Sequence, residues 1–169
     1  MASNKMVPSL NIISEKGDSI NIIESKKPKI FFSLDPECPL CKSYSKKINY
    51  LHNKYQDTID FFGFFPTSFL SSKKTDEFIQ RNQFSMQLII DSNQVLTNFL
   101  DAKVTPECFF LDKDLNTIYQ GLIDDWITEL GRKGQEVKNS YLNDAINSYL
   151  NKDSIVIRNT TAIGCIIER

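Results

Sequence analysis

The chain has 169 residues, of which 41% are hydrophobic and 24% charged, and its formal net charge is -1. This length fits one domain of roughly 150 residues with a core of its own, and the balanced charge excludes the basic surface by which proteins bind nucleic acid. We therefore expect no nucleic-acid partner. No apolar run approaches the ~20 residues of a membrane span, so we also expect no membrane span.

The N-terminal region predicts a β-hairpin. Two apolar runs, 10–14 and 19–23, flank a turn that contains Gly17, a pattern typical of hairpins. The start of the chain lacks the charged and apolar segments of a secretory signal. Because the mature part of a periplasmic or membrane-anchored protein also lacks them, this start is compatible with an extracytoplasmic and with a cytoplasmic protein.

The next elements form a β-α-β unit. Apolar strands are predicted at 29–34 and 59–65, and an amphipathic helix at 39–55 lies between them. The second strand is apolar throughout, which indicates burial on both faces of a sheet. The later elements, in chain order, are a helix at 75–82, a strand at 87–90, a helix at 93–102, strands at 108–111 and 117–120, and a helix at 137–150.

A C-terminal tail follows the last helix. Its apolar groups at 155–157 and 163–167 would be costly to leave in water, so we expect the tail to pack on the body of the protein. No repeat or low-complexity linker divides the chain. We therefore predict a single domain with an N-terminal hairpin extension, a core and a tail, at 1–27, 28–150 and 151–169.

The motif Cys38-Pro39-Leu40-Cys41 stands between the first apolar strand and the amphipathic helix. A C-x-x-C motif in this setting is typical of thiol-disulfide exchange, because the helix N-terminus stabilises a thiolate. With Pro39 as the first helical residue, Cys38 falls at the cap and Cys41 on the apolar face. We therefore expect Cys38 to be the exposed, attacking thiol and Cys41 the buried, resolving thiol.

The same motif is also half of a zinc site. A complete site needs two more ligands, and the remaining candidates, Cys108, Cys165 and His52, form no second closely spaced pair. A lone histidine such as His52 is more often a surface or packing residue. Copper handling is the least favoured interpretation, because it requires a wider cysteine spacing and a downstream histidine, neither of which this chain shows. Thiol-disulfide exchange by the two cysteines requires no metal or organic cofactor.

Three groups of residues resemble motifs of the thioredoxin-like superfamily, in particular bacterial redoxin-domain proteins related to the thiol-specific antioxidant and thiol-disulfide reductase group. They are the segment 35–41, the segment Val104-Thr105-Pro106-Glu107, and the pair of segments 119–125 and 161–166. The resemblance implies an α/β fold, with a central mixed sheet flanked by helices.

The resemblance also implies a substrate-binding edge. Pro106 would be cis and face the cysteines, leaving the Thr105 backbone free to pair with an extended peptide. From the residues alone, an ordinary turn proline is an equally good interpretation of Pro106.

The chain departs from the superfamily pattern before the first cysteine. Where thioredoxins usually have tryptophan, this chain has Glu37, with Asp35 close by. Two carboxylates oppose a thiolate, Lys42 offsets them in part, and no histidine lies between the cysteines. We therefore predict that Cys38 has a higher pKa than in strongly oxidising relatives and that the protein is a reductant.

The function predicted from the sequence is thiol-disulfide oxidoreductase acting on protein disulfides, with electrons from an upstream reductase. One alternative is a peroxiredoxin-like peroxidase, which needs Thr or Ser where this chain has Asp35 and a nearby arginine. The arginines, none in such a motif, are Arg81, Arg132, Arg158 and Arg169. Another alternative is a binding module that uses the Thr105-Pro106 edge while the cysteines are incidental.

Two further cysteines and a pair of carboxylates need an interpretation. Cys108 lies in an apolar strand and is expected to fill the core. Cys165 is either a third redox thiol, forming a disulfide with Cys38 or shielding the pair, or a packed apolar residue. Asp124 and Asp125 follow a strand and are expected to cap the segment 126–130 rather than to form an acid-base pair.

Overall fold

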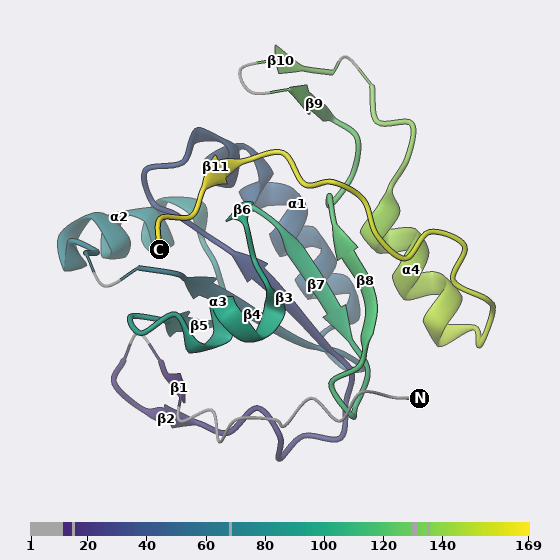
Figure 1. Ribbon diagram of the computed structural model, residues 1–169, viewed down its shortest axis with the longest axis horizontal. Helices are drawn as coiled ribbons and strands as arrows, with labels where there is room; N and C mark the ends of the chain where they lie inside the picture. Colours follow the sequence, from purple (N-terminus) through teal and green to yellow (C-terminus); the bar gives the residue numbers. More distant parts are fainter. Residues whose placement is uncertain (1–11, 15, 68, 130–131, 135) are drawn as a thin grey trace.

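A five-stranded mixed sheet forms the centre of the molecule in the computed structural model, which describes residues 12–14, 16–67, 69–129, 132–134 and 136–169 (Figure 1). The strand order is β5-β4-β3-β7-β8. The first three of these strands run parallel, and β7 is antiparallel to both β3 and β8. The strands are β3 (Lys29–Ser33), β4 (Asp60–Phe65), β5 (Gln87–Ile90), β7 (Cys108–Leu111) and β8 (Thr117–Gly121).

Helices cover both faces of this sheet (Figure 1). They are α1 (Pro39–Tyr55), α2 (Ser72–Asn82), α3 (Val95–Leu100) and α4 (Tyr141–Leu150). Side chains of α1, α2 and α4 belong to one core cluster, and those of α3 belong to a second. Strand β4 contributes side chains to both clusters. Phe61 and Phe65 belong to the first cluster, and Phe62 and Phe64 belong to the second, because successive side chains of a strand point to opposite faces of the sheet. The predicted mixed sheet flanked by helices is therefore confirmed.

Three helices begin at other residues than predicted, and one of them, α3, spans Val95–Leu100 rather than 93–102. Helix α2 starts at Ser72 rather than 75, because the Ser71 side chain caps it and accepts a hydrogen bond from the Lys74 N–H. Helix α4 starts at Tyr141 rather than 137, because the Asp125 carboxylate holds the N–H groups of residues 138 and 139 at 2.8 and 3.0 Å. For α2 and α4 a side-chain acceptor sets the boundary.

Short strand pairs lie outside the central sheet. Strands β1 (Ile12–Ile13) and β2 (Ser19–Ile20) form the predicted N-terminal hairpin, and residues 10, 11 and 15 of that prediction lie outside the described residues. Strands β9 (Ile127–Glu129) and β10 (Arg132–Lys133) form a hairpin that was not predicted. Strand β6 (Val104–Thr105) pairs with β11 (Cys165–Ile166) from the C-terminal tail.

The C-terminal tail packs on the body, as predicted. It runs along β8, where Thr160 N donates to the Gln120 carbonyl at 3.0 Å, and further on Ile167 is buried. However, Val156 and Ile166 are 91% and 83% exposed, so the expected burial is wrong for these two residues. Backbone hydrogen bonds hold much of the tail, and they leave alternate side chains in solvent.

The described part of the chain contains no helix with the length and apolar character needed to cross a membrane.

Truncating one buried ring should measure how strongly the first core cluster supports the sheet. Phe110 is completely buried and packs edge-to-face against Tyr149 at a centroid distance of 5.4 Å. We expect Phe110→Ala to lower the free energy of unfolding by about 3–5 kcal/mol, because it leaves a cavity. Phe69→Ala, at a ring that is 96% exposed, should change it by less than about 0.5 kcal/mol in the same denaturant titration. Equal losses would contradict this assignment of the core.

Candidate active site

A tight turn places Cys38 at the start of α1. The Asp35 side chain accepts a hydrogen bond from the Glu37 N–H at 2.8 Å, and the Asp35 carbonyl accepts one from the Cys38 N–H at 3.1 Å. Cys38 is the N-cap residue and Pro39 occupies the first turn. The sulfur of Cys38 therefore lies at the positive end of a 17-residue helix.

Both cysteines of the motif are buried thiols. Cys41 has no exposed surface, whereas Cys38 is 1% exposed. The prediction that Cys38 is exposed is therefore wrong. Cys38 is covered by a segment that is distant in the sequence, because the tail strand β11 pairs with β6 next to Cys38.

The environment of Cys38 favours its thiolate. A hydrogen bond from the Cys41 thiol is the largest cause that lowers the pKa of Cys38 to about 4. Hydrogen bonds from the Cys165 thiol and from the backbone of Cys41 and Leu40 add to it and together outweigh burial, which acts in the opposite direction. The predicted high pKa of Cys38 is therefore wrong.

The carboxylates that were expected to raise the pKa of Cys38 are engaged elsewhere. Glu37 forms an ion pair with Lys74 of α2 at 2.6 Å, and both side chains are mostly exposed. The hydrogen bond from Lys74 lowers the pKa of Glu37. Asp35 accepts from the Glu37 backbone. Lys74 was missed at the sequence level because it lies 37 residues from Glu37, with no local pattern to join them.

Cys41 is held in the interior as a neutral thiol. Burial is the largest cause that raises the pKa of Cys41 well above its ordinary value, and its hydrogen bond to Cys38 acts in the same direction. The Asp35 N–H points at the Cys41 sulfur from 3.4 Å. The two thiols therefore differ in acidity in the way expected of an attacking and a resolving cysteine.

The Thr105–Pro106 peptide bond is cis, and it lies beside Cys38. In its protonated form, the Cys38 thiol donates a hydrogen bond to the Thr105 carbonyl oxygen at 3.2 Å. The backbone edge of Thr105 was expected to be free, but it is paired with Cys165 in antiparallel register. The structure therefore brings together Cys38, Cys41, Thr105 and Cys165.

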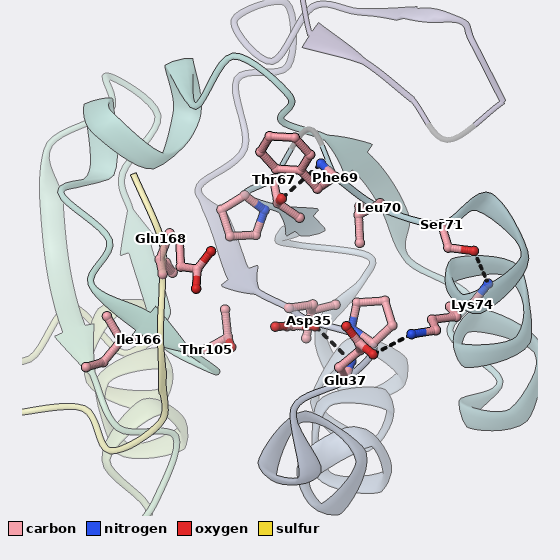
Figure 2. A pocket seen from close by; sticks show the side chains of 14 residues that line it. Asp35, Glu37, Thr67, Phe69, Leu70, Ser71, Lys74, Thr105, Ile166 and Glu168 are labelled. Carbon is pink, nitrogen blue, oxygen red and sulfur yellow. Dashed lines mark hydrogen bonds and ion pairs between the residues drawn. The ribbon is translucent and has the colours of Figure 1, made fainter.

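A pocket of about 360 Å³ opens next to this cluster (Figure 2). Figure 2 shows the Glu37 carboxylate and the Lys74 ammonium pointing toward each other at its rim. The exposed side chains of Phe69 and Ile166 give it apolar walls. The described lining residues include no arginine.

The other predicted residues lie apart from this pocket. Cys108 is fully buried in the core, where its thiol contacts the Gly121 carbonyl at 3.3 Å. His52 contacts the Ser85 hydroxyl at 3.1 Å and packs on a phenylalanine ring. Asp124 is buried and accepts hydrogen bonds from Trp126 N–H at 3.1 Å and from a tyrosine hydroxyl. Lys42 lines a second pocket, which shares Glu37 and Lys74 with the first.

The four arginines that were considered for a peroxidase site are not among the described residues that line this pocket. Arg81 pairs with Glu77 and Arg132 with Glu129, Arg169 donates to the Ala102 carbonyl, and the Arg158 carbonyl accepts from Gln120. Within the residues that the structure describes, no group of three or more His, Cys, Asp or Glu side chains is arranged to hold a metal ion.

Comparisons with known proteins identify the architecture. No family model and no curated protein matches the chain. An uncharacterised conserved protein from Geobacillus kaustophilus superposes with a TM-score of 0.82 over 94% of this chain and 87% of its own, at 18% identity.

The chain is also similar to two solved structures whose fold or activity is known. A secreted disulfide oxidoreductase from Mycobacterium tuberculosis gives a TM-score of 0.57 at 14% identity, covering 64% of this chain and 80% of its own. A thioredoxin-like protein from Aeropyrum pernix gives 0.57 at 17% identity, covering 67% and 80%. Together with the mixed sheet and the helices on both of its faces, these similarities show that the chain has a thioredoxin-like fold.

Proposed function

We propose that this protein is a thiol-disulfide oxidoreductase that uses Cys38 and Cys41. The observation that carries the proposal is the contrast between the two thiols at the N-terminus of α1. The pKa of Cys38 is lowered to about 4 and that of Cys41 is raised. A nucleophilic thiolate beside a neutral thiol is the arrangement that disulfide exchange requires.

The proposed reaction has two exchange steps. The Cys38 thiolate attacks one sulfur of a substrate disulfide, forming a mixed disulfide and releasing the first substrate thiolate. Cys41 then loses its proton and attacks the Cys38 sulfur, which releases the second substrate thiolate and leaves a Cys38–Cys41 disulfide. In this direction the protein substrate is reduced by two electrons, and the same two steps in reverse oxidise a substrate dithiol. A separate redox partner must restore the starting state of the couple.

The low pKa of Cys38 bears on the direction of electron flow. A stabilised thiolate stabilises the reduced protein, which makes its disulfide easier to reduce. The prediction of a reductant depended on a high pKa of Cys38, and that premise is wrong. We therefore propose that the Cys38–Cys41 couple has an oxidising rather than a strongly reducing potential.

Insulin reduction by dithiothreitol tests the activity. We expect the protein to accelerate the precipitation of insulin chains roughly tenfold or more. Cys38→Ser should remove the acceleration, because it removes the nucleophile, while Cys108→Ser, at a buried core thiol, should retain it. Acceleration that persists in Cys38→Ser, or none in the folded wild type, would contradict the proposal.

The same protein samples separate the two alternatives. A peroxidase would consume hydrogen peroxide rapidly when reduced, but the described lining of the pocket contains Lys74 and no arginine to polarise a peroxide. A binding module would leave insulin reduction unchanged. Fast peroxide decay without insulin reduction would favour the peroxidase.

A further inference from the structure

The tail strand β11 pairs with the edge of β6 to which an extended peptide would otherwise add (Figure 1). Cys165 is opposite Thr105, and Ile166 is opposite Val104, in antiparallel register. This is the geometry of β-strand addition, in which backbone pairing supplies affinity. The approach is so close that a side chain at position 164 would collide with the Thr105 carbonyl oxygen, so Gly164 is required there.

Cys165 and Cys38 meet at this edge. The Cys38 sulfur contacts the carbonyl oxygen of Thr105, the residue that pairs with Cys165. Burial and a hydrogen bond with Cys38 raise the pKa of Cys165 to about 12. The tail thus holds a third thiol against the thiol that we propose as the nucleophile.

Contacts on either side of Cys165 fix the position of the tail. On the N-terminal side, the Thr160 hydroxyl accepts from the Leu122 N–H at 2.8 Å. On the C-terminal side, Ile167 N donates to the Lys103 carbonyl at 3.0 Å and the Ile167 side chain is buried. Between these anchors Cys165 is only partly buried and Ile166 is exposed. Cys165 therefore lies over Cys38, where it packs against the first core cluster without being fully buried.

We propose that β11 occupies the place of the substrate peptide in the reduced protein and that Cys165 is a third redox thiol, which exchanges a disulfide with Cys38. This inference rests on the proposed function, because it needs Cys38 to be the attacking thiol. It also explains why a nucleophile can be buried, since an incoming substrate must displace β11 to reach it.

The proposed exchange passes two electrons to the substrate disulfide. With β11 displaced, the Cys38 thiolate attacks a disulfide R–S–S–R′, and R′S⁻ leaves and takes up a proton. When β11 returns before Cys41 has attacked the mixed disulfide, Cys165 loses its proton, its sulfur attacks Cys38, and RS⁻ leaves. The product is a Cys38–Cys165 disulfide, the two electrons having passed to the substrate. Attack by Cys41 on Cys38 then frees Cys165 and forms the Cys38–Cys41 disulfide.

Removing the competing thiol makes the inference testable. Reduced full-length Cys41→Ser is treated with oxidised glutathione, and free thiols are alkylated before non-reducing peptide mapping by mass spectrometry. We expect a Cys38–Cys165 linked peptide as the main product, with glutathione lost. A stable adduct of glutathione on Cys38, with Cys165 alkylated, would overturn the inference.

Matched variants control this experiment. Cys41→Ser with Cys165→Ser should keep glutathione on Cys38, whereas Cys41→Ser with Cys108→Ser should still form the Cys38–Cys165 link. If a serine at the fully buried position 41 prevents folding by circular dichroism, Cys41→Ala replaces it.

The wild type separates failure of this inference from failure of the proposed function. If it forms a Cys38–Cys41 disulfide with glutathione while Cys41→Ser keeps its adduct, only the role of Cys165 is wrong. If Cys38 reacts in neither protein, the proposed function fails as well.

Discussion

Cys41→Ala is expected to raise the pKa of Cys38 from about 4 toward the ~8.5 of an ordinary cysteine. The Cys41 thiol is the largest cause of the lowered pKa, and alanine removes this hydrogen-bond donor while keeping the helix. At pH 6 the wild-type Cys38 should be almost entirely thiolate, whereas in the variant the thiolate should fall below ~1% if the shift is complete.

The measurement is the ultraviolet absorbance of the thiolate as a function of pH in the reduced proteins. The sign is specific, because a lowered pKa places the wild-type transition in acid and the variant transition in alkali. Cys41→Ser should lie between them, since a serine hydroxyl can also donate a hydrogen bond. A wild-type transition near pH 8.5 would contradict the electrostatic account of the site.

Gly164→Ala is expected to expose Cys38. The new methyl group cannot fit against the Thr105 backbone, so β11 should move away from β6. Because Cys38 is 1% exposed in the closed arrangement, its rate of alkylation by iodoacetamide should rise by about tenfold or more as local opening becomes easier. Peptide mapping after timed quenching reports the rate at Cys38 alone.

A second substitution in the tail controls for general loosening. Val156→Ala changes a side chain that is 91% exposed, so the alkylation rate of Cys38 should stay at the wild-type value. Buried Cys108 should remain protected in both variants. If Gly164→Ala leaves the Cys38 rate unchanged, β11 does not control access to the thiol.

Local patterns in the sequence predicted much of the fold. The apolar strand before Cys38, the proline at the first turn and the apolar face of the following helix are contained in one stretch of chain, and α1 has the predicted bounds. The alternating faces of β4 were likewise readable from continuous apolar residues. These features depend on residues close in sequence, for which periodicity is informative.

The properties of Cys38 could not be predicted in the same way. Its burial depends on β11, which is more than 120 residues further along the chain. Its pKa depends on the distance between two sulfurs, which the C-x-x-C spacing alone does not define. The charge of Glu37 suggested an opposing effect, but Glu37 pairs with Lys74 of α2. Tertiary contacts therefore decided both corrections at the site.

The most direct test of the account is the midpoint potential of the Cys38–Cys41 couple. The wild-type protein is equilibrated with glutathione redox buffers, and the Cys38–Cys41 disulfide is quantified by mass spectrometry. We predict one disulfide between these residues with a midpoint between about -120 and -230 mV, because the Cys38 thiolate is stabilised. The absence of this disulfide at every buffer ratio, or a midpoint near the roughly -270 mV of a reducing thioredoxin, would contradict it.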